Sequence, residues 1–345
     1  FMTATCEFGR FDDHDRVSAG EYVLLNKNGG GIGLFTTTRL VYALPNEYLN
    51  RFFYDTVFDF VDQKPQRLGD IYVGTKNKFA QNSADRNYRK FALLGDPAIK
   101  LAIPEFKVQI DSFNKDTVNA LSEVVVFGHL EDELGIELSN FSGKVYLTFY
   151  DKESSLTTLG TNPSSDTLPF KMWKNIIYRG KSSVSNGLFS FTFKVPKDIG
   201  YSYGFSRMSL YAENGFIDAS GYNDSLIIGG IDTNATIDEN GPELELYLND
   251  ENFVSGGISN SSPLLIVSVF DENGINTVGN GIGHDIELII DGDNSSSVIL
   301  NDYYESDLDT YQSGKIFFEL SELSPGDHTV ELKVWDNYNN SSKSD

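Results

Sequence analysis

The sequence contains little cysteine and little histidine, with one Cys and four His in 345 residues. A single cysteine excludes a disulfide framework, and it excludes a zinc site built from several thiolates of this chain. No run of 18 or more apolar residues occurs, so we predict no membrane-spanning helix. Basic residues are also scarce: 27 Lys and Arg stand against 50 Asp and Glu, and the net charge of −23 argues against nucleic-acid binding.

The charge is unevenly distributed along the chain. Residues 1–104 hold 13 basic and 12 acidic residues, residues 105–232 hold 11 and 16, and residues 233–345 hold 3 and 22. Each segment is long enough to bury a core of its own. We therefore predict three domains with these boundaries. Residues 1–5 lack the features of a signal peptide. Because the chain opens within an apolar predicted strand and stops in a polar run, we interpret it as an internal part of a longer polypeptide.

The first segment alternates the patterns of strands and helices. Short apolar stretches rich in β-branched residues predict strands at Phe1–Cys6, Gly31–Thr38 and Ala98–Ile103. Apolar residues at helical spacing predict three helices between them, namely Ala19–Asn26 capped by Ser18, one opened by Pro45, and Gln66–Phe79. This order predicts the C-terminal part of an α/β domain with a mainly parallel sheet.

From Glu105 onward the pattern changes to short alternating strands separated by Gly, Pro, Asn and Ser. A polar linker is predicted at Ile231–Asn240. Each β segment has the size of an immunoglobulin-like sandwich, so we predict two all-β domains of that type. The clearest strands are Val124–Phe127, Lys144–Tyr150, Leu188–Val195, Ser209–Tyr211, Leu244–Leu248, Leu264–Phe270, Asp285–Ile290, Lys315–Leu320 and His328–Trp335.

Cys6 is the strongest candidate for chemistry. It ends a predicted strand, and the loops at the carboxyl ends of strands carry the reacting groups of α/β folds. A thiol there can attack a carbonyl carbon, and its own backbone N–H can donate to the resulting oxyanion. The alternative is a buried and unreactive cysteine, the usual state of a lone Cys. Position alone leaves both interpretations open.

A nucleophilic cysteine needs a base, and the histidines offer little choice. His14 follows Cys6 by eight residues on the same predicted loop, where a solvent-exposed side chain is the simpler interpretation. His129, His284 and His328 belong to the β segments, where we expect them to pack or to form hydrogen bonds. We therefore expect this chain to hold a nucleophile without its base.

Two motifs resemble the gingipain family of cysteine peptidases. Residues 1–13 (FMTATCEFGRFDD) resemble its nucleophile segment, and residues 91–101 (FALLGDPAIKL) resemble the strand that closes its catalytic domain. Within that family the chain is most similar to the gingipain-like sortase of the type IX secretion system of Bacteroidota. The stretches that carry this similarity are Ser18–Tyr22, Leu34–Tyr42, Gly241–Pro242, Asp271–Asn276, Gly283–Asp285, Leu300–Tyr304 and Trp335–Asn340.

The resemblance implies a caspase-like fold for residues 1–104, with Cys6 as the nucleophile and the general-base histidine before Phe1. It also implies a substrate pocket near Thr36, Thr37, Thr38 and Arg39. The implied enzyme is a cysteine endopeptidase that removes the C-terminal sorting domain of secreted cargo through a thioester. It passes the acyl group to water or to an amine on cell-surface lipopolysaccharide, and it works with other secretion-system components on the extracellular face of the outer membrane.

We expect no cofactor and no catalytic metal. The acidic runs Asp12–Asp15 and Asp291–Ser297 leave a structural Ca²⁺ open, but solvated loops are the favoured interpretation of both, and the second lacks the final Glu of an EF-hand. The alternative function is a non-catalytic cell-surface protein whose β-sandwiches bind protein or glycan, with Cys6 buried.

Overall fold

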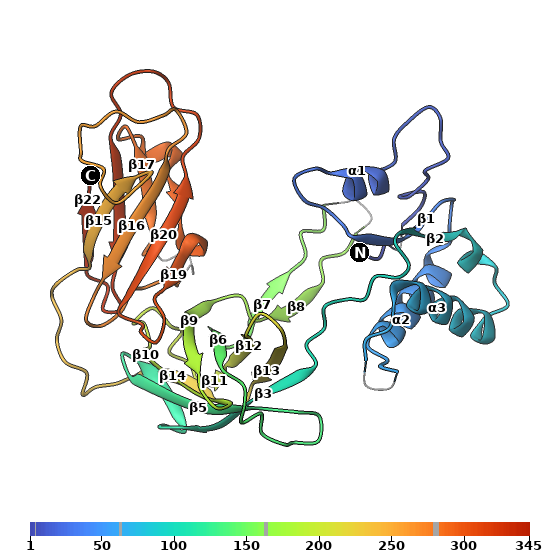
Figure 1. The fold of residues 1–345 in the computed structure, drawn as a ribbon, viewed down its shortest axis with the longest axis horizontal. Coiled ribbons are helices and arrows are strands. Elements are labelled where there is room, and N and C mark those ends of the chain that lie inside the picture. The colour runs from blue at the N-terminus through green and yellow to red at the C-terminus, as the bar shows by residue number, and fades with distance from the viewer. Residues whose placement is uncertain (4, 62–63, 162–164, 279–282) are drawn as a thin grey trace. The chain divides into compact units, whose positions relative to one another are not determined.

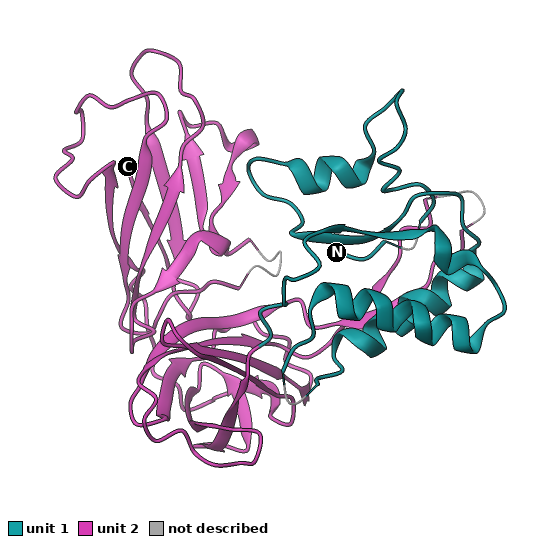
Figure 2. Cartoon of the chain, turned by 45° about the vertical axis from the view of Figure 1, so that its right-hand side comes forward, with its two compact units in different colours: residues 1–103 teal, residues 104–345 magenta. Residues whose placement is uncertain are grey.

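The computed structural model describes residues 1–3, 5–61, 64–161, 165–278 and 283–345. It divides into two compact units, Phe1–Ile103 (unit 1) and Pro104–Asp345 (unit 2), drawn in two colours in Figure 2. The further division at residue 232 stays a prediction. Among the described residues, no helix is long and apolar enough to cross a membrane.

Unit 1 combines three α-helices with a small sheet (Figure 1). Its elements are α1 (Ala19–Leu25), β1 (Gly33–Thr37), α2 (Ala43–Val57), α3 (Leu68–Asn82), the 3₁₀-helix η1 (Asn87–Lys90) and β2 (Phe91–Gly95). β1 pairs with β2 in antiparallel register, while Met2 forms a parallel bridge to Phe35 on the other side of β1. The described part of the first predicted strand is therefore reduced to one bridge.

Local signals explain where the helices of unit 1 begin. Ser18 caps α1 through a capping box: its hydroxyl accepts from the Glu21 backbone N–H, and the Glu21 carboxylate accepts from the Ser18 backbone N–H at 2.8 Å. The helix ends before Gly30, whose φ of +138° suits a residue without a Cβ. Between the helices and the sheet, a small core forms from Phe35, Leu49, Phe79 and Phe91.

The strand predicted over Ala98–Ile103 is wrong, because the last strand is β2 and it runs antiparallel to β1. The carbonyl oxygens of Pro97 and Ile99 instead accept hydrogen bonds from the Gly69 and Leu68 N–H groups, at 2.9 and 2.8 Å. These donors lie in the first turn of α3, where a helix cannot satisfy its own N–H groups. The apolar stretch therefore caps a helix instead of extending the sheet.

The N-terminal part of unit 2 is a curled sheet of seven strands in the order β10-β5-β3-β13-β12-β6-β9. The two end strands, β9 and β10, are consecutive in sequence and meet at the Asn186-Gly187 turn, where both residues have positive φ, as in hairpin turns. The sheet therefore curls around one buried apolar core, with its two end strands joined by this turn. The strands are β3 (Phe106–Phe113), β4 (Thr117–Ala120), β5 (Glu123–Glu131), β6 (Gly143–Tyr150), β7 (Ser154–Thr157), β8 (Pro169–Met172), β9 (Ile176–Val184), β10 (Leu188–Lys194), β11 (Gly204–Phe205), β12 (Arg207–Glu213), β13 (Asp218–Asn223) and β14 (Ile227–Ile231).

Three further strands, β11, β14 and β4, form a smaller sheet, and β7 and β8 form a hairpin. Two pairings connect the beginning of this region with its end. β13 runs parallel to β3, and β14 runs parallel to β4.

The C-terminal part of unit 2 consists of two four-stranded sheets, β15-β16-β20-β19 and β18-β17-β21-β22, which share one apolar core. Leu265, Val267 and Val269 of one sheet and Leu332 and Val334 of the other are almost completely buried. The elements are β15 (Glu243–Leu248), β16 (Leu264–Phe270), β17 (Glu287–Ile290), η2 (Asn294–Ser296), β18 (Val298–Ile299), η3 (Asn301–Tyr303), β19 (Tyr304–Ser306), β20 (Ser313–Glu319), β21 (Val330–Trp335) and β22 (Ser341–Ser344).

Two aspartates join the parts of unit 2 through side-chain hydrogen bonds. The Asp309 carboxylate accepts from the Ser183 backbone N–H (2.6 Å), the Ser183 hydroxyl (2.7 Å) and the Ser182 hydroxyl (2.9 Å). The buried Asp198 carboxylate accepts from Asn276 and Asn339 and contacts His284 Nδ1 at 2.6 Å. Both aspartates bridge residues that are about 80 or more positions apart.

Candidate active site

Cys6 follows directly after the segment that runs beside β1. The Phe35 N–H donates to the Phe1 carbonyl oxygen (2.9 Å), and the Thr3 N–H donates to the Phe35 carbonyl oxygen (3.0 Å). Cys6 itself is exposed. This exposure contradicts the alternative of a buried, unreactive cysteine.

The backbone turns sharply at the thiol. Glu7, the next residue, has a φ of +56°, a left-handed conformation that costs energy for a residue with a side chain. The Cys6 thiol donates a long hydrogen bond of 3.5 Å to the Val41 carbonyl oxygen, in the loop between β1 and α2. The sharp turn thus presents the thiol between two loops of unit 1.

The four residues predicted near the substrate pocket divide into two pairs. Thr36 and Thr37 have no exposed surface. Thr36 Oγ1 is 2.7 Å from Thr3 Oγ1, and the Thr37 hydroxyl donates to the Thr5 carbonyl oxygen. These two threonines therefore contact the Cys6 segment instead of solvent, and only Thr38 and Arg39 remain accessible enough to touch a substrate.

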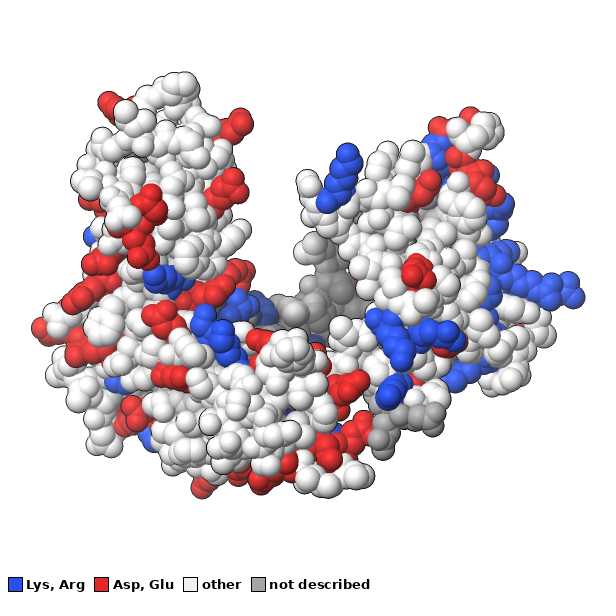
Figure 3. Space-filling view, viewed as in Figure 1, with Lys and Arg blue, Asp and Glu red and all other residues white. Residues whose placement is uncertain are grey.

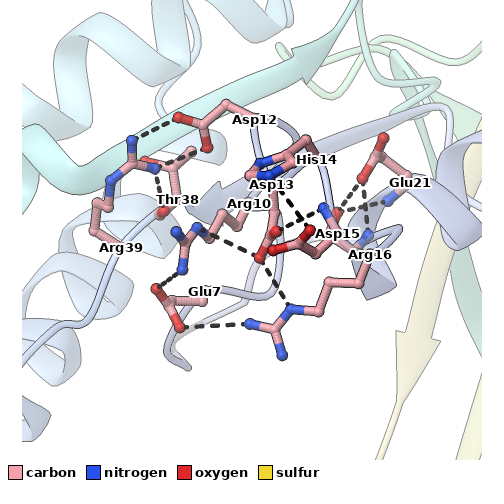
Figure 4. A network of polar contacts seen from close by, with 11 residues as sticks. Glu7, Arg10, Asp12, Asp13, His14, Asp15, Arg16, Glu21, Thr38 and Arg39 are labelled. Atoms are coloured by element: carbon pink, nitrogen blue, oxygen red, sulfur yellow. Dashed lines mark hydrogen bonds and ion pairs between the residues drawn. The ribbon is translucent and has the colours of Figure 1, made fainter.

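Arg39 joins the loop after β1 to the loop after Cys6. Its guanidinium forms two hydrogen bonds with the Asp12 carboxylate, at 2.9 and 2.6 Å, and a third with the Thr38 carbonyl oxygen (Figure 4). The hydrogen bond from Arg39 lowers the pKa of Asp12. Both groups are about half exposed, so a charged part of a substrate can compete for either one.

The loop after Cys6 is further held by a ring of alternating charges that sequence reasoning missed. Arg10 and Arg16 each contact both Glu7 and Asp13, with N–O distances from 2.9 to 3.8 Å (Figure 4). The signal was present in the sequence, because the four charges alternate in sign at every third residue. Such a ring restricts the loop that carries the thiol.

None of the four histidines contacts the Cys6 thiol within the described part of the chain. His14 is 91% exposed and contacts Asp15 at 3.3 Å. The other three bind carboxylates in unit 2: His129 binds Asp111 and Glu131, His284 binds Asp198, and His328 binds Asp291. That the general base lies before Phe1 stays a prediction.

Among the described residues, two groups of Asp and His side chains lie close enough to hold a metal ion: Asp13, His14 and Asp15 in unit 1, and Asp238, Asp271 and Asp336 in unit 2. Burial raises the pKa of Asp271 to about 7, and the neighbouring Asp336 and Asp238 charges act in the same direction. Two carboxylates of the predicted Asp291–Ser297 loop already have partners. Asp293 accepts from Ser295 and Ser296 of the loop, while Asp291 bonds with the Thr329 N–H and the His328 ring outside it. On the face in Figure 3, acidic side chains are frequent on unit 2 and basic ones on unit 1.

Comparison with known proteins places this site in a family. Residues 1–102 match the model of peptidase family C25. This segment belongs to peptidase family C25. The C25 segment contains Cys6, both loops that flank the thiol, and β2.

The whole chain is similar to a larger protein. Dimeric latent PorU from Porphyromonas gingivalis is 34% identical over 90% of this chain and 30% of the PorU chain, with a TM-score of 0.44. This chain therefore spans less than a third of that relative. The sequence identity supports a gingipain-type, PorU-like assignment beyond the C25 segment.

Other solved structures are much less similar. The Arg-specific cysteine proteinase gingipain R is 10% identical, covering 64% of this chain and 44% of that chain, with a TM-score of 0.28. Spo0M from Bacillus subtilis is 14% identical, covering 63% and 91%, with a TM-score of 0.25. None of the curated proteins compared with the chain matches it.

Proposed function

We propose that the chain is the nucleophile-bearing part of a longer cysteine endopeptidase and transpeptidase of the gingipain type. The single observation that carries this proposal is the exposed Cys6 thiol, presented on a tight turn inside the segment that belongs to family C25. An exposed thiol beside a strand end has the access that a nucleophile needs, whereas a structural cysteine is normally buried.

The proposed reaction proceeds through a thioester. The Cys6 sulfur attacks the carbonyl carbon of the scissile peptide bond, the C–N bond breaks, and the amine leaves with a proton from the base. Water or an amine then attacks the thioester and regenerates the thiol. Within the described residues the Cys6 backbone N–H makes no hydrogen bond, so it can donate to the oxyanion. The reaction needs no cofactor.

The proposed partners follow from the similarity to PorU and the gingipain type. The substrate is secreted cargo that bears a C-terminal sorting domain, and the acceptor amine belongs to cell-surface lipopolysaccharide. The enzyme acts with other components of the type IX secretion system at the extracellular face of the outer membrane. In architecture, residues 1–104 form the C-terminal part of a caspase-like domain, and residues 105–232 and 233–345 form immunoglobulin-like sandwiches. The paired four-stranded sheets around one core support the last assignment.

The test is a Cys6→Ala variant of the longer protein. We expect cargo cleavage to fall by at least about 1,000-fold, the order of loss seen when a catalytic nucleophile is removed, while circular dichroism stays unchanged. His14→Ala serves as the matched control on the same loop and should keep its activity. Cargo processing by a folded Cys6→Ala variant would rule out the proposal.

The 345-residue chain alone should not cleave cargo, because no described histidine reaches Cys6 to form the thiolate. Incubation of purified chain with cargo, followed by mass spectrometry, checks this. Cleavage that disappears in Cys6→Ala and in His14→Ala would instead identify His14 as the base.

A further inference from the structure

The segment that carries Cys6 has little regular backbone pairing of its own. Beyond the parallel bridge at Met2, the residues around the thiol lie in bends and turns. Loops of this kind adopt several conformations unless side chains fix them. The position of the thiol must therefore depend on contacts from a neighbouring regular element.

That element is β1, and the contacts come from two adjacent threonines. Thr37 binds the Cys6 turn on both sides of the cysteine: its hydroxyl donates to the Thr5 carbonyl oxygen and accepts from the Phe8 N–H at 3.4 Å. The Thr37 carbonyl oxygen accepts from the Gly9 N–H at 2.9 Å. Thr37 thus contacts Thr5, Phe8 and Gly9, which lie one residue before Cys6 and two and three residues after it.

Thr36 secures the approach to this turn. Its hydroxyl lies 2.7 Å from that of Thr3, and both threonines are buried. Adjacent residues of a strand point to opposite faces of the sheet, so Thr36 and Thr37 hold the segment on both faces. A Cβ on Gly9 would lie 2.2 Å from Thr36 Cγ2, which shows how closely the turn packs onto β1.

The turn needs this support because it contains a strained residue. Glu7 has its left-handed φ of +56° between the two groups that Thr37 binds, Thr5 and Phe8. Such a conformation persists only where surrounding contacts enforce it. A buried hydroxyl with both donor and acceptor roles in use provides that enforcement.

We propose that Thr37 is a positioning residue for the Cys6 nucleophile, and that Thr36 supports it through Thr3. Neither threonine touches the substrate. This inference rests on the proposed function, and it changes the role predicted for both threonines from substrate contact to orientation of the thiol. It further implies that loss of the hydroxyl lowers kcat and leaves KM nearly unchanged.

The decisive variants are Thr37→Val, which removes the hydroxyl at nearly constant volume, and Thr37→Ser, which keeps it. In the longer protein, Thr37→Val should lower kcat for cargo cleavage by about 10- to 100-fold, the scale of a misplacement of about 1 Å, with KM within about twofold. Thr37→Ser should restore kcat to within about threefold. The matched control is Thr75→Val, because Thr75 is equally buried in unit 1 and its hydroxyl donates within α3, to the Ile71 carbonyl oxygen.

A second measurement does not depend on peptidase activity. In the 345-residue chain, iodoacetamide should alkylate Cys6 at least about threefold faster in Thr37→Val than in wild type or Thr75→Val, since a loosened turn frees the thiol from Val41. Unchanged alkylation together with unchanged kcat in Thr37→Val overturns the inference, as does a serine variant that is as impaired as the valine variant. An active Cys6→Ala variant would contradict the proposed function. The alkylation rates of Thr37→Val and Thr75→Val would then still test whether Thr37 positions the Cys6 thiol.

If Thr37→Val does not fold, the double variant Thr3→Val/Thr36→Val decides instead. It replaces both members of a buried hydroxyl pair by apolar groups of similar shape, a change that is nearly neutral for folding. We expect it to lower kcat by about threefold to 10-fold through the neighbouring turn. A folded double variant with wild-type kcat overturns the inference.

Discussion

The two units differ in how well they bury their apolar side chains. Among the described residues of unit 1, seven apolar side chains are buried and 15 large ones are exposed, whereas unit 2 buries 39 and exposes 26. Because apolar burial is the main favourable term in folding, the hydrophobic contribution to the stability of unit 2 is the larger one. Unit 1 relies to a greater extent on polar contacts, which hold the Cys6 loop in place. The candidate chemistry therefore lies on the unit that buries fewer apolar side chains, and we expect this unit to be the less stable one.

The variant with the largest expected effect on stability removes an aromatic ring from the core of unit 2. Phe193 has no exposed surface and stacks on Tyr178 with ring centroids 4.4 Å apart. Phe193→Ala should cost about 3–5 kcal/mol, as for other buried aromatic residues. Hydrogen exchange with mass spectrometry should show faster exchange in unit 2 and no change in unit 1. Phe127→Ala, on neighbouring β5, is the control, because Phe127 is 49% exposed. Equal acceleration in both units would mean that they unfold together.

A second test weakens the polar connection within unit 2. Asp309→Asn keeps the size of the side chain but removes the charge that accepts three hydrogen bonds from Ser182 and Ser183. We expect a loss of about 1–2 kcal/mol in urea unfolding, since hydrogen bonds to charged groups exceed neutral ones. Asp302→Asn is the control, because Asp302 is 82% exposed and forms one ion pair, with Arg179. If both variants lose the same free energy of unfolding, the Asp309 carboxylate does not join the two parts of unit 2.

The cluster of Asp238, Asp271 and Asp336 makes the stability of unit 2 depend on pH. Burial raises the pKa of Asp271 to about 7, so the folded state binds its proton more tightly than the unfolded state does. The stabilisation that comes from this tighter proton binding is fully present below about pH 4 and is lost as the pH rises through about 7. Asp271→Asn should therefore stabilise unit 2 by about 1 kcal/mol or more at pH 8 and hardly at all at pH 4. Thermal unfolding in EDTA measures this, and an equal effect at both pH values would contradict the role of the charge.

The smallest effect is expected in unit 1, at the start of α1. Ser18→Ala removes the cap and should cost about 0.5–1 kcal/mol. Ser18→Thr retains the hydroxyl and is the matched variant. Hydrogen exchange of residues 19–25 should increase in the alanine variant only, while unit 2 stays unchanged. Increased exchange in unit 2 would contradict the separation of the units.

Much of the local structure was predictable from sequence. Ser18 was identified as a cap, and the predicted strand Leu264–Phe270 has the same limits as β16. These elements depend on signals within a few residues: a hydroxyl before a helix, or a β-branched apolar run between turn residues. The position of Cys6 at the end of a predicted strand is likewise a local signal; its exposure contradicts a buried cysteine, and its catalytic role stays a prediction.

The missed features depend on residues that are distant in sequence. The Ala98–Ile103 stretch was predicted as a strand because its use as a cap for α3 involves residues about 30 positions earlier. Thr37 looked like a pocket residue because nothing in the sequence shows that its hydroxyl meets Thr5, 32 positions away. The Arg39–Asp12 pair spans 27 positions. Local patterns cannot specify such partners, because they are chosen by the packing of the whole unit.

The two parallel strand pairings within residues 105–232, one in the seven-stranded sheet and one in the three-stranded sheet, have a mechanical consequence. β3 and β4 begin this part of unit 2, β13 and β14 end it, and each early strand lies parallel to a late one. Tension that pulls residue 105 towards the N-terminus and residue 232 towards the C-terminus slides these neighbours past each other. The hydrogen bonds between parallel strands then bear the load together instead of opening one by one. We infer that residues 105–232 carry tension along their length until these two pairings separate.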